Sequence, residues 1–201
     1  MRGPILLTLL VGNLSVAGCA TELSAPPEGD ELRSPVVLGR AVTVLLGPSH
    51  RRYEPNVRLF ELLNRRTNER YTVEIGSKDQ AFVLQLPAGT YELTRVQISE
   101  GPFMSMADFG SAFEVSPLPL TYVGTWRFGI DSPRYGRMMV MSVVQDDQEQ
   151  AEAVRQVAAQ YPTLSGQLPA RATLIPNEAE SRLYEVMPYP RYLPYFRRHW
   201  W

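Results

Sequence analysis

The chain has 201 residues, with 20 Lys and Arg against 21 Asp and Glu, and a formal net charge of -1. This length suits one domain with appendages, and a hydrophobic content of 44% excludes a wholly disordered chain. The near balance of charges gives no excess of basic residues that would attract nucleic acid, so we expect no nucleic-acid partner. One cysteine excludes an internal disulfide and a multi-thiolate metal site, and two histidines leave little for a zinc enzyme. We therefore expect no metal and no cofactor.

Residues 1–18 have the pattern of a signal peptide. A single basic residue, Arg2, precedes a largely apolar stretch from Ile5 to Val16. Crossing a bilayer takes about 20 apolar residues, whereas the core of a signal peptide takes about 7–15. The sequence VAGC then ends on Cys19, the single cysteine of the chain.

The VAGC sequence resembles the lipobox of bacterial lipoproteins. The resemblance implies that the Cys19 thiol carries diacylglycerol and that the chain is cut between Gly18 and Cys19. Cys19 then becomes the first residue and usually gains a third acyl chain such as palmitate. Two or more acyl chains give stable anchoring. Ala20 follows where inner-membrane lipoproteins tend to carry Asp, so the resemblance favours the outer membrane, with a periplasmic or surface-facing body. The alternatives are a plain secretory signal and a short N-terminal core helix.

The segment from Thr21 to Pro35, TELSAPPEGDELRSP, is acidic and rich in proline, with no apolar period. This composition is typical of an unstructured tether. We expect residues 19–35 to be a lipidated N-terminus and flexible linker that lets the body stand off the membrane. The alternative is that part of the segment packs on the domain as an extended strand.

From Val36 the chain consists of short strand-like runs separated by turn residues. The predicted strands are 36–46, 57–63, 71–75, 81–86, 90–98, 112–115, 120–128 and 138–144. This spacing indicates an all-β sandwich or barrel, and we predict a single mainly β sandwich over residues 36–176. In the run 90–98 the apolar positions change side, which predicts a bulge near Thr94 and Arg95.

One helix is predicted over residues 147–160, with apolar residues at helical spacing. Asp146 with Glu149 forms a start like a capping box, and Pro162 ends the helix. The sandwich is therefore expected to carry one covering helix.

The sequence LPAGTYEL at residues 86–93 resembles the turn and strand of transthyretin-like and carboxypeptidase-regulatory-like β-sandwiches. The order of a strand at 121–128 and a helix at 146–160 is similar to that of small uncharacterised bacterial lipoproteins. The resemblance covers roughly residues 36–176. It implies a sandwich fold and no known catalytic residue.

Three groups of side chains are candidates for chemistry. Tyr122 and Trp126 are expected on one face of their strand, where they either stack a sugar ring or belong to the core. His50, after Ser49, is either a catalytic base or a solvated loop residue. The acidic cluster at residues 146–149 either holds a metal or performs acid–base work, or it caps the helix.

Arg65, Arg66 and Arg70 form a basic run between two predicted strands. The run is either an exposed loop or a contact with anionic lipid head groups.

Residues 177–201 are expected to form a C-terminal tail rich in proline and aromatic residues, and its most unusual stretch is 187–201, MPYPRYLPYFRRHWW. Its prolines favour an extended path, and it carries three arginines and no acid. Aromatic residues and arginine are enriched at binding hot spots and at membrane interfaces. The tail is expected to dock on a partner or a membrane, or to fill a groove on its own domain. Its aromatic residues are Tyr189, Tyr192, Tyr195, Phe196, Trp200 and Trp201.

Together these observations predict an envelope lipoprotein that is not an enzyme and acts as an interaction or structural module. Its expected partners are the membrane, through the lipid, and an envelope protein. The alternatives are a carbohydrate- or peptidoglycan-binding module that uses Tyr122 and Trp126, and a periplasmic hydrolase that uses His50.

Overall fold

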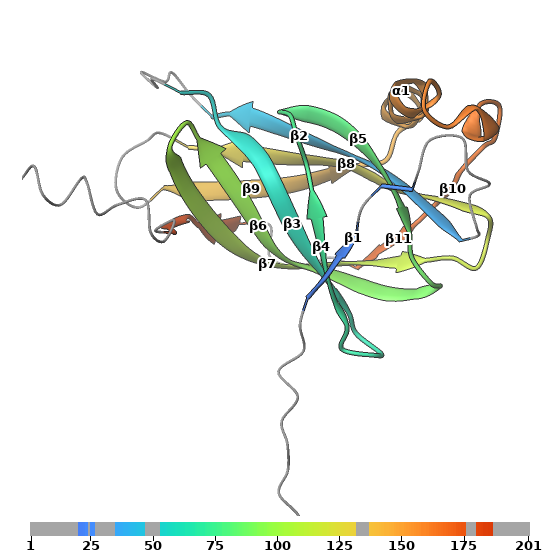
Figure 1. Ribbon diagram of the computed structural model, residues 1–201, viewed down its shortest axis with the longest axis horizontal. Helices are drawn as coiled ribbons and strands as arrows, with labels where there is room; N and C mark the ends of the chain where they lie inside the picture. Colours follow the sequence, from blue (N-terminus) through green and yellow to red (C-terminus); the bar gives the residue numbers. More distant parts are fainter. Residues whose placement is uncertain are drawn as a thin grey trace, which may run out of the picture.

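The computed structural model describes residues 20–23, 25–26, 35–46, 53–131, 137–175 and 180–186. Over these residues the chain is mainly β, with two sheets packed face to face and one α-helix (Figure 1). The predicted fold, a β-sandwich with one covering helix, is confirmed.

The first sheet has the strand order β1-β4-β3-β6-β7-β11, and β13 also pairs with β7. Its neighbours are antiparallel except for β1 and β4, which run parallel. The bounds are β1 Thr21–Leu23, β3 Asn56–Asn64, β4 Arg70–Glu74, β6 Gly89–Glu100, β7 Phe103–Val115, β11 Thr173–Ile175 and β13 Tyr184–Glu185.

The second sheet has the strand order β12-β9-β8-β2-β5, and β10 also pairs with β8. Strand β8 lies between β9, which is antiparallel to it, and β2, which is parallel to it. The bounds are β2 Val36–Leu45, β5 Asp79–Gln85, β8 Leu120–Ile130, β9 Met138–Val144, β10 Ala170–Arg171 and β12 Glu180–Arg182.

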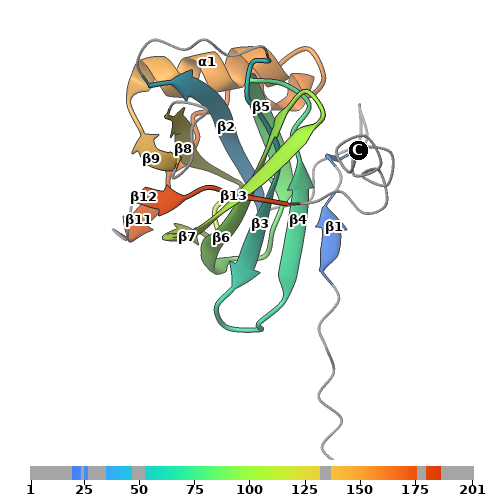
Figure 2. The same cartoon turned by 90° about the vertical axis from the view of Figure 1, so that its left-hand side faces the viewer.

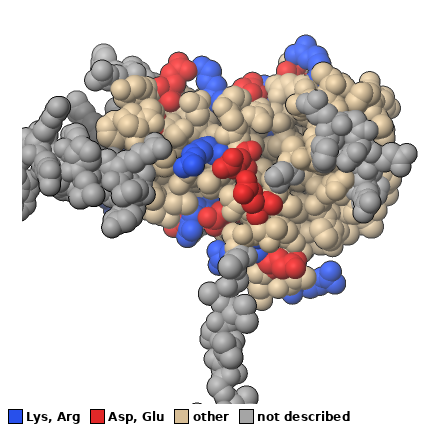
Figure 3. All heavy atoms as spheres, in the orientation of Figure 1, with Lys and Arg blue, Asp and Glu red and all other residues tan. Residues whose placement is uncertain are grey.

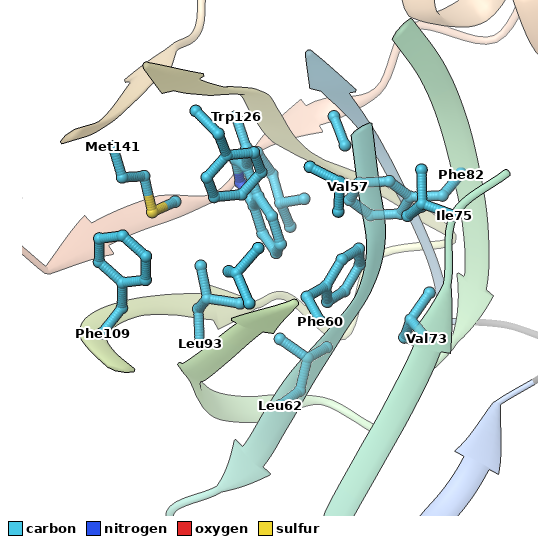
Figure 4. Close-up of a cluster of buried hydrophobic side chains, with 14 of the residues drawn as sticks. Val57, Phe60, Leu62, Val73, Ile75, Phe82, Leu93, Phe109, Trp126 and Met141 are labelled. Carbon is cyan, nitrogen blue, oxygen red and sulfur yellow. The ribbon is translucent and has the colours of Figure 1, made fainter. Parts of the chain in front are cut away.

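The main core lies between the two sheets and is rich in aromatic rings (Figure 4). Trp126 is at its centre, with ring centroids 5.0 Å from Phe60, 5.3 Å from Phe82 and 5.7 Å from Phe113. Such separations are typical of favourable tilted and edge-to-face pairs. The strands point these large side chains inward. Burying them removes apolar surface from water, which stabilises the packing of the two sheets.

A third layer is formed by α1 (Asp147–Val157), which crosses the outer face of the second sheet (Figure 2). A smaller core fills this interface and includes Leu38, Tyr122 and Val157. A 3-10 turn at Pro162–Leu164 follows the helix and adds Leu164 to the same core. The helix ends three residues before the predicted limit, and the chain continues in turns as far as Gln160.

Bulges in β6 and β8 set which of their side chains face the core. The pairing of β6 shifts between Leu93 and Arg95 against both neighbouring strands, so the predicted bulge near Thr94 is confirmed. A second bulge in β8 was not predicted. There the register against β2 shifts, because Val123 and Gly124 together oppose Gly39.

The sheets extend beyond the predicted domain limits of 36 and 176. Strand β1 lies in the segment that was expected to be a flexible tether. Strands β12 and β13 lie in residues 177–201, which were expected to be a tail. The sequence alternative, in which part of the tether packs on the domain as an extended strand, is the one the structure bears out for Thr21–Leu23.

Candidate functional site

The predicted lipidation and cleavage residues, Gly18 and Cys19, lie outside the described residues. The described chain begins at Ala20 and enters β1 at Thr21. Thr21 pairs with Tyr71 and Leu23 with Val73 in parallel register. The folded sheet therefore starts two residues after the cysteine.

The β3–β4 hairpin projects beside the start of β1 (Figures 1 and 2). Its turn is held by the buried side chain of Asn64, whose Oδ1 accepts from the backbone N–H of Arg66 (3.0 Å) and of Thr67 (3.2 Å). Asn68 closes the turn with a φ of 58°, a left-handed conformation that asparagine tolerates better than most residues. The turn therefore has a defined backbone conformation.

The basic run predicted from the sequence lies on this hairpin. Arg65 is paired with Glu92 at 2.9 Å, whereas Arg66 and Arg70 are exposed and form no ion pair with any residue that the structure describes. The hydroxyl groups of Tyr71 and Thr67 donate to Glu69 and lower its pKa. Burial and the bond to Glu69 raise the pKa of Tyr71 to about 12, which favours the protonated hydroxyl that donates to Glu69.

The second candidate surface, the aromatic tail of residues 187–201, lies outside the described residues. The described chain ends just before it, at Val186, whose N–H donates to the carbonyl of Met104 at 2.9 Å. Two large apolar side chains are exposed where the chain leaves the sheet, Phe103 at 47% and Tyr184 at 41%. The described chain therefore ends beside β7 in the first sheet, next to exposed aromatic rings.

The proposed sugar-stacking pair, Tyr122 and Trp126, does not form a platform. Tyr122 is 0% exposed and Trp126 is 1% exposed, so neither ring offers a face to a sugar. The two rings also lie on opposite sides of β8, because the bulge at Gly124 turns Tyr122 toward α1 and Trp126 toward the main core. The interpretation that placed both rings on one binding face is therefore wrong, and both are core residues.

The acidic cluster at the start of α1 has a structural role in the described molecule. Oδ1 of Asp146 accepts from the N–H of Glu149 at 2.7 Å, which is an N-cap, as the capping alternative predicted. Glu149 contacts Arg127 and also Arg40 Nη1, the latter at 2.7 Å. Asp147 is fully exposed and pairs with Arg171.

Arg40 joins this cluster to the sheet and was not singled out from the sequence. Its guanidinium binds Asp79 through Nε at 2.6 Å and also contacts Glu149. The hydrogen bond to Asp79 raises the pKa of Arg40 and lowers that of Asp79. Burial alone would raise the pKa of Glu149, but hydrogen bonds from Arg127 and Thr125 and the charges of both arginines hold it below its ordinary value. The sequence signal for Arg40 was a single charged residue within an otherwise uncharged strand.

Two further sequence candidates remain without a structural test. Ser49 and His50 fall outside the described residues.

Within the described ranges, no group of three or more His, Cys, Asp or Glu is arranged to hold a metal ion.

No helix in the described part of the chain is long and apolar enough to cross a membrane. No family model, curated protein or solved structure matches this chain.

Proposed function

We propose that this protein is an envelope lipoprotein, anchored in the outer membrane through Cys19, and that it acts as a non-catalytic interaction module. The observation that carries the proposal is the single cysteine of the chain at the end of VAGC, two residues before a folded β-domain begins. Two or more acyl chains on that cysteine would anchor the domain stably.

The shifted pKa values around Arg40 in the described part of the chain are consistent with an interaction module, because structural ion pairs explain them. Asp79, Glu149 and Arg40 all have shifted pKa values, which are often a sign of an active site. Here these groups neutralise one another and attach α1 to the second sheet. Their shifts are accounted for by a structural ion network.

Lipidation is tested by growing cells with an alkyne analogue of palmitate and by measuring the mass of the N-terminal peptide. The expected result is label in the full chain, none in Cys19→Ser, and a mature chain that begins at Cys19. Ala20→Ser is the matched control, because it changes the neighbouring residue and leaves VAGC intact. An unlabelled wild-type protein cut elsewhere would refute the anchor.

The aromatic tail is the proposed contact surface for a protein of the envelope. It contains Tyr, Trp and Arg, the residue types that dominate binding hot spots. The last described backbone bond, Val186 N–H to Met104, lies before the tail, so the described strands all precede residue 187. A chain that ends at Val186 keeps these strands and removes Tyr189, Tyr192, Tyr195, Phe196, Trp200 and Trp201.

The contact is tested with a photo-crosslinking amino acid at Tyr192 in intact cells. Leu168 is the control position, because it is 91% exposed on a loop outside the tail. We expect a discrete protein adduct from position 192 and none from 168. The chain that ends at Val186 should melt at the same temperature as the full chain. A large fall in its melting temperature would show that the tail belongs to the core, which would refute its role as a contact surface.

A further inference from the structure

The place of β1 in the first sheet fixes where a lipid at Cys19 would hold the domain. Two residues of chain extend at most about 7 Å, so the anchor cannot lie far from Thr21. Because Thr21 pairs with Tyr71, the Cα atom of Cys19 is at most about 16 Å from that of Arg70. The 15-residue stand-off expected from the sequence is therefore absent on the N-terminal side of β1.

The direction of β1 shows which end of the domain this is. Strand β1 runs parallel to β4, which begins directly after the hairpin turn. Thr21, at the start of β1, therefore lies at the end of the strand nearest that turn, and both views show the hairpin projecting at this side (Figures 1 and 2).

The hairpin carries an excess of positive charge at its tip. Its segment RRTNER, residues 65–70, holds three arginines and one glutamate. Glu69 accepts hydrogen bonds from the neighbouring hydroxyl groups of Thr67 and Tyr71, and Arg65 pairs with Glu92. Arg66 and Arg70 remain exposed. Figure 3 shows charged side chains of both signs at the lower edge of the molecule, where the hairpin projects in Figure 1.

We propose that the β3–β4 hairpin is the membrane-facing end of the domain, and that Arg66 and Arg70 bind the anionic head groups of the bilayer that holds the lipid. This inference rests on the proposed anchor at Cys19. A flexible tether would let the domain tumble, whereas an anchor two residues from a sheet edge restricts its orientation. Because the Cα atom of Arg70 is at most about 16 Å from the anchor, its extended side chain can reach within the screening length of about 10 Å from the surface. The domain is held upright by two contacts, one covalent and one electrostatic.

The test uses the mature lipidated protein in vesicles, with a fluorescent label whose emission is quenched by spin-labelled head groups. Because Cys19 is acylated, a single new cysteine takes the label. Thr67→Cys places it at the hairpin tip, and Ser77→Cys places it in the exposed turn at the other end of β4. Vesicles contain either neutral lipid or about one third anionic lipid.

We expect strong quenching at position 67 and weak quenching at position 77 in anionic vesicles. The difference should fall in neutral vesicles and at high salt, because screening weakens the attraction. Each basic side chain near an anionic surface contributes about fivefold to binding, so Arg66→Gln with Arg70→Gln should lower the equilibrium constant for docking about 25-fold. The matched control, Lys78→Gln with Arg155→Gln, removes the same charge from exposed sites elsewhere and should leave the quenching unchanged.

Equal quenching at the two labels, or no effect of the hairpin pair, would overturn the orientation while leaving the anchor intact. The mass of the N-terminal peptide separates this outcome from a failure of the proposed function. If Cys19 carries no acyl chain, the proposed anchor and this inference both fail.

Discussion

The change of face in β8 can be tested at Gly124, the residue that turns Tyr122 and Trp126 to opposite sides. Gly124 has a φ of 98°, which side-chain-bearing residues rarely adopt. A Cβ atom added there would lie 2.5 Å from Cγ1 of Val143 and 3.1 Å from the carbonyl oxygen of Val144. Gly124→Ala should therefore cost stability through both backbone strain and steric overlap with β9.

Two other glycines separate these causes. Gly166 has a φ of 83°, and nothing lies within 4 Å of an added Cβ, so its substitution tests backbone strain alone. Gly39 has an ordinary φ, but an added Cβ would meet Cζ of Phe82 at 2.3 Å and Cγ2 of Val123 at 2.8 Å. The Phe82 ring cannot withdraw easily, because it packs against Trp126 with centroids 5.3 Å apart. Gly39→Ala therefore tests overpacking.

The magnitudes follow from these contacts. A left-handed alanine costs about 1–2 kcal/mol, and part of this is offset by about 0.4–1 kcal/mol from the stiffer unfolded chain. We expect Gly166→Ala to cost about 0.5–1 kcal/mol. Overpacking typically costs about 1–3 kcal/mol, so Gly39→Ala should cost about 1–2 kcal/mol and Gly124→Ala about 2–4 kcal/mol.

The assay is urea unfolding of the mature protein followed by far-ultraviolet circular dichroism. Tryptophan fluorescence is less suitable, because Trp200 and Trp201 in the tail would add to the signal of Trp126. The denaturant slope should stay constant across the series, so that midpoints report stability. If Gly124→Ala costs no more than Gly166→Ala, β8 does not pack on Val143 as described, and the change of face would be wrong.

Two further predictions concern the attachment of α1. Arg40→Met should lower the free energy of unfolding by about 2–3 kcal/mol at pH 7, because it removes the positive charge that pairs with Asp79 and Glu149. Because Arg40 lowers the pKa of Asp79, this stabilisation is present above about pH 4 and is lost as the pH falls further. An equal loss of unfolding free energy in Arg40→Met at pH 7 and at pH 3 would contradict it. Asp146→Ala should cost about 1 kcal/mol by urea unfolding, and the exposed Asp147→Ala well under half of that.

The long strands and the helix could be predicted because their signals are local. The run 138–144 is a strand with the predicted bounds, and the run 36–46 differs from β2 by one residue. The helix cap at Asp146 follows from a side chain that satisfies an N–H three residues later. The bulge near Thr94 left its mark as a change of spacing between Leu93 and Val96, which both face the main core.

Other parts of the fold left no such signal. Only the last four residues of β7 were predicted, because its earlier buried face contains the small residues Ser105 and Ala107. Strands of two or three residues, such as β1, cannot show alternation, and their pairing depends on a distant partner. In β8 the glycine itself was the signal, since an isolated glycine within a strand often marks a bulge. Reading an unbroken two-residue period through Gly124 placed Tyr122 on the wrong side.

The first and last described strands, β1 and β13, lie at opposite corners of the first sheet, which bears on what the tail contacts. Five strand spacings separate β1 from β13, about 24 Å across the sheet. Strand β13 runs from Met106 toward Met104, and so toward the β6–β7 turn. Along β6, the β6–β7 turn lies about 30 Å from Tyr91. Tyr91 pairs with Asn64, at the base of the β3–β4 hairpin turn. If the hairpin faces the bilayer, the tail starts on the far side of the domain, where a protein partner is within easier reach than a lipid. We therefore expect the photo-crosslinker at Tyr192 to capture protein. To reach lipid, the tail would have to double back along the full length of the sheet.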